Sequence, residues 1–362
     1  MHGINFVHKD INEWSKDCID SILAEGVNEH SDLFREGRDV WVIQSYIALK
    51  RNGRLPVYLS SVYRKDCINI AHRTDVARED CEQHFVASIR ADREPMFYAH
   101  YEIVQNKYSV WASNHAYIPH WPQPGLIKRE DSRGQTIEKI SFFGKACHLK
   151  PEFLQNSFKE ALAHLSCELK VHENDWKDYS NTDLVMAIRD GHRFYLDFKP
   201  ASKLVNAWKA GCPILVNREA GYEELKKSNL DFFEAEKPEE VISIIKYLKE
   251  NPKTYQSMVV NGKKRAAEFD HELITQHWLN VIENQLQPAF QTWFHRPRLA
   301  SKNRLAYVRA RLWGYQATQY PQSKKRLLIS LVRVSLAYPS NWTKIVKRYL
   351  FGRSKTGFNN PV

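Results

Sequence analysis

The sequence predicts an α/β protein built from two doubly wound domains that face a cleft, followed by a basic helical tail. Over residues 1–285, short apolar runs alternate with segments of helical periodicity, a pattern typical of parallel sheets covered by helices. The length of 362 residues suits two such domains. Residues 288–362 contain fifteen Lys and Arg and no Asp or Glu, which leaves 38 basic against 42 acidic residues elsewhere. We therefore place the domains at 1–140 and 141–287 and the tail at 288–362.

The first domain contains five apolar runs that we predict to be strands. Their continuous apolar character favours strands buried on both faces, as in a parallel sheet. Helical spacing of apolar residues predicts helices at Asn12–Ala24 and Asp39–Lys50, the second with Asp39 as its N-cap. Three prolines make Tyr117–Gly125 a fixed loop. The predicted strands are Gly3–His8, Leu55–Leu59, Cys67–Ala71, Phe85–Ile89 and Tyr101–Gln105.

The alternation is clearer from residue 137 to residue 285, and it predicts the second doubly wound domain. Gly211 stands where a glycine commonly ends a helix. The predicted strands are Ile137–Phe143, Cys167–His172, Asp183–Arg189, Pro213–Val216 and Leu230–Glu234. The predicted helices are Asn156–His164, Ala201–Ala210, Tyr222–Lys227, Pro238–Glu250, Lys253–Phe269 and His271–Gln285.

The composition narrows the class of protein. With 43% hydrophobic and 26% charged residues, the chain is neither disordered nor fibrous. Six cysteines without a Cys-x-x-Cys pair, together with a polar N-terminal segment, predict reduced thiols and a cytoplasmic location. A run of about 18 uncharged apolar residues, which a membrane-spanning helix needs, does not occur in the sequence.

The start of the predicted helix Ala201–Ala210 is the most informative stretch. Pro200 is a good residue for the first helical turn, and the free amides of a helix start form an anion site. Lys199, Ser202 and Lys203 add two cations and a hydroxyl to it. Asn206 lies one turn after Lys203, so a diphosphate at the helix start could present a ribose to Asn206. A capped amphipathic helix with surface lysines is the alternative interpretation.

The order of motifs after this helix resembles the donor-binding half of GT-B glycosyltransferases, especially those of family 4 (glycosyl transferases group 1, bacterial type). The helix ends in Ala210-Gly211, a Cys-Pro and an apolar strand follow, and then comes Ala220-Gly221 with Glu224. The Asn251-Pro252 step and the later Met258, Gly262 and Arg265 are similar to the closing helices of that family. The resemblance covers about residues 140–285 and implies a glycosyltransferase that uses a nucleotide-diphospho-sugar. The Phe142–Lys145 segment is similar to the opening strand and glycine loop of the donor domain.

The resemblance implies which residues bind the donor. Gly144, Lys145, Lys199, Ser202 and Lys203 would stabilise the departing diphosphate without a metal, and the sequence contains no Asp-x-Asp. Arg189 is a further candidate, because it ends a predicted strand and ligands bind beyond the carboxyl ends of strands. Asn206, Gly221 and Glu224 complete the donor set, and no cofactor is expected.

The sequence departs from the family at two positions. Many retaining members have two Glu eight positions apart, and Phe198 and Asn206 stand there in this chain. The stereochemistry of the reaction therefore stays open, and so does a second interpretation, a non-catalytic relative that acts as a membrane-bound scaffold.

Four residues are candidates for the general base on the acceptor side. His8 follows the first strand, Asp92 follows the strand Phe85–Ile89, His100 precedes a strand, and His120 lies in the proline-rich loop. Trp121 and Tyr117 are near His120 and could stack on a sugar ring. Structural roles are the alternative for each of these residues.

The tail predicts contact with an anionic partner. Basic residues, Trp and Leu on predicted helices at 293–311, 324–338 and 342–351 are typical of an element that lies on a membrane surface. A polysaccharide or lipid-linked acceptor would fit a peripheral position on the inner membrane face. A helical extension that wraps the acidic body, or a nucleic-acid binder, are the alternatives.

Overall fold

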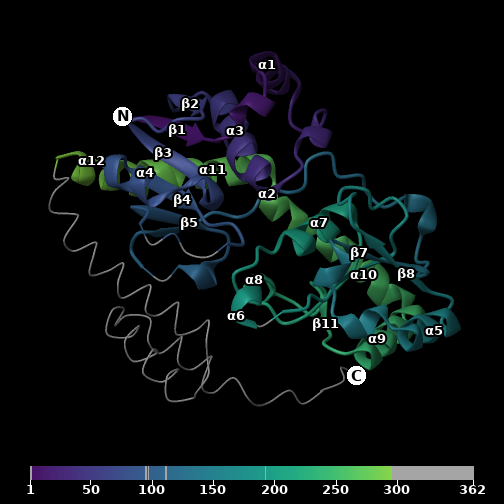
Figure 1. The fold of residues 1–362 in the computed structure, drawn as a ribbon. Helices are drawn as coiled ribbons and strands as arrows, with labels where there is room; N and C mark the ends of the chain where they lie inside the picture. Colours follow the sequence, from purple (N-terminus) through teal and green to yellow (C-terminus); the bar gives the residue numbers. More distant parts are fainter. Residues whose placement is uncertain (1, 94–95, 97, 111, 192, 296–362) are drawn as a thin grey trace, which may run out of the picture. The chain divides into compact units, whose positions relative to one another are not determined.

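The computed structural model describes residues 2–93, 96, 98–110, 112–191 and 193–295. The chain divides into two compact units, of which the first comprises Met1–Val110 and Asn114–Phe290. The fold described below is that of the first unit (Figure 1). The predicted tail helices lie outside the described residues, apart from residues 293–295, which end a helix that begins at Gln287. No helix among the described residues is both long and apolar enough to cross a membrane.

The first sheet is parallel, as predicted, and has the strand order β2-β1-β3-β4-β5-β6. One strand, β6, was not predicted, because three residues after a turn give too short a pattern to recognise. β1 pairs with both β2 and β3, so the strand order reverses at β1. The strands are β1 (Gly3–Val7), β2 (Val57–Ser60), β3 (Cys67–His72), β4 (Val86–Ile89), β5 (Tyr101–Val104) and β6 (His115–Tyr117).

Helices cover the faces of this sheet. α1 spans Lys16–Glu25, and a continuous helical stretch spans α2 (Gly37–Asp39), a π-helical segment (Val40–Gln44) and α3 (Ser45–Asn52). α4 spans Arg78–Gln83. The predicted N-cap role of Asp39 is wrong: Glu36 is the N-cap. Asp39 lies inside the first turn, and its Oδ2 accepts hydrogen bonds from the amides of Arg35 and Glu36.

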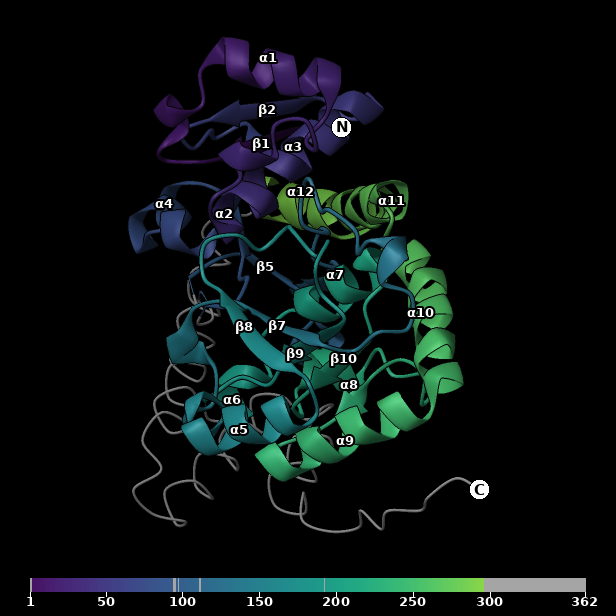
Figure 2. The same cartoon turned by 90° about the vertical axis from the view of Figure 1, so that its right-hand side faces the viewer.

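The C-terminal helices of the unit return to the first sheet. α11 (His271–Val281) continues through a π-helical segment (Ile282–Leu286) into α12 (Gln287–His295). Trp278 of α11 is buried edge-on to Phe6 of β1, with ring centroids 5.8 Å apart. The two views show α11 beside the strands of the first sheet (Figure 2). The sequence analysis had grouped the α11 segment with the second domain.

The second sheet is also parallel, with the order β11-β10-β9-β7-β8. β7 pairs with β8 on one side and with β9 on the other, so the strand order reverses between β7 and β9. In sheets of this kind, ligands bind beyond the carboxyl ends of the strands at such a reversal. The strands are β7 (Lys139–Phe143), β8 (Glu168–His172), β9 (Leu184–Ala187), β10 (Ile214–Val216) and β11 (Phe233–Glu234).

Six helices accompany the second sheet among the described residues: α5 (Asn156–His164), α6 (Arg193–Leu196), α7 (Ser202–Ala210), α8 (Ala220–Glu223), α9 (Pro238–Glu250) and α10 (Pro252–Ala266). α7 ends at Gly211, whose φ of 79° is the left-handed conformation that glycine adopts without strain. Trp208 of α7 packs against Gly262 of α10, where an added Cβ would lie 3.0 Å from the indole ring. α10 is thereby held close to α7.

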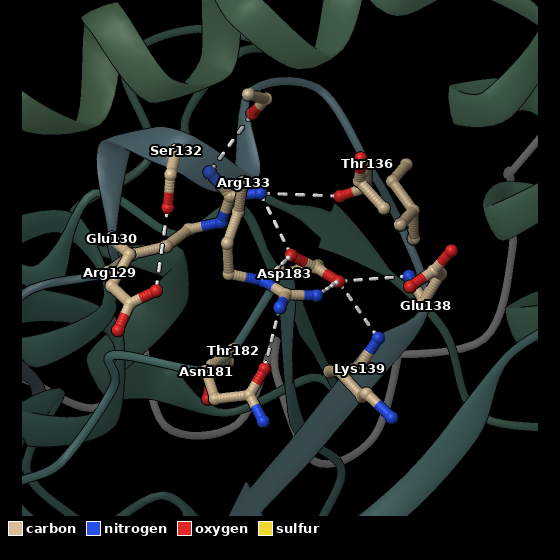
Figure 3. A network of polar contacts seen from close by, with 12 residues as sticks. Arg129, Glu130, Ser132, Arg133, Thr136, Glu138, Lys139, Asn181, Thr182 and Asp183 are labelled. Atoms are coloured by element: carbon tan, nitrogen blue, oxygen red, sulfur yellow. Dashed lines mark hydrogen bonds and ion pairs between the residues drawn. The ribbon is translucent and has the colours of Figure 1, made fainter.

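A buried carboxylate fastens the segment that enters the second sheet. Asp183, directly before β9, accepts hydrogen bonds from the side chains of Arg129 and Arg133 and from the amides of Glu138 and Lys139 (Figure 3). The two arginines hold the pKa of Asp183 below its usual range against the effect of burial, which raises it. This network fixes the start of β7 beside the start of β9, and so sets the spacing of the two strands at the reversal.

Candidate functional site

The carboxyl edge of the second sheet brings several predicted residues together. β7 leads into Gly144, β9 leads towards Arg189, and β10 is followed by Asn217 and Glu219. Gly144 has a φ of 150°, and a Cβ added there would lie 3.0 Å from Nζ of Lys203. Gly144 therefore lets the Lys203 side chain approach the end of β7 closely.

Lys203 is the central cation of this edge. It projects from the first turn of α7, and its Nζ lies 4.8 Å from the centroid of the Phe142 ring. Within the described residues, its Nζ makes no hydrogen bond or ion pair. Burial, Arg189 and Lys199 lower the pKa of Lys203 from 10.5 to about 7, although Glu219 opposes this. The ammonium is thus held where its charge is not compensated, which is the condition that favours binding of an anion.

Arg189 and Glu219 lie side by side, and the charges of both act on Lys203. The Arg189 Nε is 3.3 Å from Oε1 of Glu219, but the guanidinium donates its hydrogen bonds to the Tyr222 hydroxyl at 2.6 Å and to the Pro200 carbonyl at 3.4 Å. Glu219 is 1% exposed, and neither of its oxygens accepts a hydrogen bond from any described residue. Burial raises the pKa of Glu219 to about 7, despite the neighbouring Arg189 and Lys203.

His148 also belongs to this cluster, and the sequence analysis missed it. His148 is exposed at the surface, but part of its ring is covered by the protein. This partial burial is the largest cause that lowers its pKa, followed by the charges of Lys199, Lys203, Arg189 and Lys145, in that order. The same side chains that were predicted to bind phosphate therefore act on one histidine. We call Lys145, His148, Arg189, Lys199 and Lys203 the cation cluster. Its members come from the ends of β7 and β9 and from the start of α7.

The segment before α7 is fastened to the first domain. Asn106 donates to the carbonyls of Asp197 and Lys199, at 3.0 and 3.2 Å, and Gln105 donates to the carbonyl of Phe198. α7 starts at Ser202, with Ala201 as its N-cap, two residues later than a helix whose first residue is Pro200. The Ser202 side chain is partly exposed at this helix start.

An ion pair joins a donor-side and an acceptor-side candidate. Nζ of Lys199 is 2.6 Å from Oδ2 of Asp92. Burial acts to raise the pKa of Asp92, but Lys199 outweighs it, and the pKa is lowered. The preceding residue, Ala91, has a φ of 48°, a conformation that a non-glycine residue rarely adopts. This local strain turns the chain at the end of β4 and places Asp92 opposite Lys199.

Three further donor candidates bond to the protein itself. Asn206 is buried, and its Oδ1 accepts the amide of Gln123 at 3.1 Å. Glu224 Oε2 accepts the amide of Lys107 at 2.8 Å. A Cβ on Gly221 would lie 2.8 Å from the carbonyl oxygen of Lys199, so a glycine is needed for the close approach of these two turns.

On the acceptor side, His8 and His120 have different surroundings. His8 at the end of β1 is fully buried, with Nε2 3.1 Å from Oδ1 of Asp39 and with Nδ1 unbonded among the described residues. His120 donates through Nδ1 to the carbonyl of Trp121. Burial lowers the pKa of His120, while that hydrogen bond and the charge of Asp92 raise it. His120 is therefore within electrostatic reach of Asp92.

His100 lies at the opposite edge of the first sheet, because it precedes β5. Its Nδ1 accepts the amide of Val86 at 3.2 Å, and its ring stacks on Phe85. The predicted stacking role of Trp121 also does not fit the structure. Trp121 is fully buried, and its indole nitrogen donates to Ser45 at 2.8 Å, so this aromatic ring is part of the core.

No group of three or more His, Cys, Asp or Glu side chains suited to a metal ion occurs among the residues that the structure describes.

Comparison with known proteins adds the class of protein. Residues 153–280 match the family described as Glycosyl transferase-like. HepE from Anabaena, in complex with UDP and glucose, is similar at 12% sequence identity and a TM-score of 0.46, over 78% of this chain and 100% of that chain. Pneumococcal O-GlcNAc transferase GtfA, in complex with UDP and GlcNAc, is similar at 12% identity and a TM-score of 0.44, over 68% of this chain and 60% of GtfA. No curated protein matches the sequence.

The matched family and the two parallel sheets together define a glycosyltransferase of the GT-B class, as the sequence predicted. The match lies in the second domain and includes Arg189, Lys199, Lys203 and Glu219 of the carboxyl edge. Residues 153–280 are thus similar to the Glycosyl transferase-like family.

Proposed function

We propose that this protein transfers a sugar from a nucleotide-diphospho-sugar to a hydroxyl of a polysaccharide or lipid-linked acceptor. The observation that carries the proposal is the cation cluster at the strand reversal of the second sheet. Burial lowers the pKa of Lys203 and of His148, and the neighbouring cations Arg189 and Lys199 lower both further. A diphosphate supplies negative charge to such a cluster.

The chemistry follows from the leaving group. The bond from the anomeric carbon to the diphosphate oxygen breaks, and negative charge grows on the diphosphate. Lys203, Arg189 and Lys145 are proposed to stabilise that charge directly, with Gly144, Ser202 and the amides at the start of α7. Gly221 keeps the turn at Lys199 in place. Asn206 and Glu224 are proposed to support the site through their contacts with the protein.

On the acceptor side, we assign the general base to Asp92, assisted by His120. Asp92 follows a strand of the first domain, and its carboxylate pairs with Lys199, a member of the cation cluster. When a diphosphate competes for Lys199, the carboxylate becomes available to take the proton of the acceptor hydroxyl. His8 is the alternative base, because its Nδ1 is unbonded among the described residues.

A thermal-shift panel of UDP, GDP and ADP tests the proposal, followed by hydrolysis of the matching nucleotide-sugar. We expect one nucleotide to raise the melting temperature in a concentration-dependent way, as a ligand that binds only the folded state must. If none of the three shifts the melting temperature and no nucleotide-sugar is turned over, the protein is a non-catalytic relative.

The basic tail is proposed to hold the enzyme at the cytoplasmic face of a membrane. Residues 288–362 have fifteen positive and no negative side chains, a balance that attracts anionic lipid. Deletion of residues 296–362 should abolish binding to vesicles that contain anionic lipid while nucleotide binding persists. Preferential, salt-dependent binding of RNA or DNA over such vesicles would favour a nucleic-acid partner.

A further inference from the structure

Glu219 is a buried carboxylate for which the fold provides no hydrogen bond. It is 1% exposed, and both of its oxygens are among the buried polar atoms without a hydrogen-bond partner in the described structure. A buried carboxylate without a hydrogen bond is costly, and native structures retain few of them without a reason. Arg189 forms an ion pair with it, with Nε 3.3 Å from Oε1, but the Nη2 hydrogen bonds of Arg189 go to Tyr222 and Pro200.

The position of Glu219 links it to the proposed donor site. It follows β10 at the carboxyl edge, beside β9, which leads to Arg189. The charges of Arg189, Lys203 and Lys199 all act on its carboxyl group. A group that reaches Glu219 would therefore lie next to the cations that are proposed to bind the diphosphate.

The sequence lacks carboxylates at two positions, and Glu219 can take over their function. Phe198 and Asn206 stand where many related enzymes have carboxylates, and the structure uses both for packing. The Phe198 ring lies 4.1 Å from the guanidinium carbon of Arg90, and Asn206 bonds to Gln123.

We propose that Glu219 accepts a hydrogen bond from a hydroxyl group of the bound nucleotide-sugar and so selects for that hydroxyl. The inference rests on the proposed function. A carboxylate suits this task because it accepts and does not donate, and a hydroxyl is a neutral donor that can sit beside the cations. The hydroxyl belongs either to the sugar or to the ribose. Lys203, which has no hydrogen bond to hold it among the described residues, is the neighbouring side chain that shifts to admit the ligand.

The test compares Glu219→Gln with the wild-type chain. The substitution keeps the shape and removes the negative charge, so we expect the unliganded protein to melt at an equal or higher temperature. Glu234→Gln, on exposed β11 of the same sheet, is the matched control and should behave as wild type. Binding is measured by calorimetry with UDP, GDP or ADP, whichever binds, with its 2′-deoxy form, and with its glucose and N-acetylglucosamine conjugates.

If the hydroxyl belongs to the sugar, Glu219→Gln should weaken binding of the conjugates at least tenfold and leave the nucleoside diphosphate unchanged or tighter. If it belongs to the ribose, Glu219→Gln should bind the nucleoside diphosphate itself at least tenfold more weakly than the wild type does. The 2′-deoxy form should then bind the variant and the wild type equally. Unchanged affinity for every ligand in a variant that still binds the diphosphate would overturn the inference and leave the proposed function standing. Failure of the wild-type chain to bind any of the diphosphates would instead overturn the proposed function.

Discussion

Replacing Lys203 should make the free protein more stable and should lower its affinity for a nucleoside diphosphate. Lys203→Met keeps the aliphatic stem that lies against Phe142 and removes the ammonium. The pKa of Lys203 falls from 10.5 to about 7 in the folded protein. By linkage, a depressed lysine pKa means that the charged form costs folding free energy at and below pH 7, and that this cost disappears as the pH rises towards 10.5.

The size of the effect follows from the same shift. The full difference corresponds to about 5 kcal/mol, and partial exposure of the side chain reduces it to about 2 kcal/mol at pH 6. Urea unfolding at pH 6 should therefore show Lys203→Met to be more stable than wild type. The gain should shrink at pH 9, where the wild-type lysine is already neutral.

Binding should change in the opposite direction. Loss of one cation aimed at a diphosphate is worth about 3 kcal/mol, or roughly a hundredfold in the affinity for a nucleoside diphosphate and in turnover. Lys209→Met is the matched control, since Lys209 lies on the same helix and only approaches Asp270 at 3.9 Å. A variant of Lys203 that is less stable than wild type, or that binds the nucleotide equally well, would show that this lysine is a packing residue and not a phosphate ligand.

Three further predictions test other parts of the structure. The affinity for a nucleoside diphosphate should fall by up to about tenfold per pH unit above pH 7, because a bound phosphate needs the charged form of Lys203. Calorimetry should then show that binding takes up a proton. An affinity that does not change with pH would exclude Lys203 as a phosphate ligand. Gly221→Ala should cost about 1–3 kcal/mol in thermal unfolding, because its Cβ meets the Lys199 carbonyl, whereas Gly37→Ala, with no atom within 4 Å of its Cβ, should not. Asp183→Asn should lower the free energy of unfolding by about 3–5 kcal/mol at pH 7, because it leaves two arginines under-paired. This loss of stability relative to wild type should become smaller as the pH falls below 4, because the pKa of Asp183 is depressed and acid removes its contribution in the wild type. An equal loss at pH 7 and below pH 4 would argue against the network.

The sequence predicted elements well where the signals are local. Helices Asn156–His164 and Pro238–Glu250 have the predicted bounds, because apolar periodicity and a proline at the first turn are read directly from neighbouring residues. It failed at one helix start and at one very short strand. Asp39 is not an N-cap because Glu36 takes that place, and β6 is too short to give a pattern.

At the candidate site, too, the sequence predicted some residues and missed others. The rule that ligands bind beyond strand ends selected Arg189, and the same rule applied to the strand Pro213–Val216 could have found Glu219. Nothing in the sequence marks Glu219 as unbonded, because that depends on where the hydrogen bonds of Arg189 go. His148 was missed for a related reason, since its proximity to four cations arises from three separate elements.

The exchange of acids for packing residues at Phe198 and Asn206 has a consequence for charge. In a site where two carboxylates face the donor, they offset part of the positive charge that binds phosphate. Here that offset is reduced to Glu219 and to the ion pair of Asp92 with Lys199. Burial raises the pKa of Glu219 to about 7, so at neutral pH its carboxyl is partly neutral and compensates the cations incompletely. Both features leave the carboxyl edge more positive than it would be with two ionised acids, and this excess of positive charge favours an anionic ligand such as the proposed diphosphate.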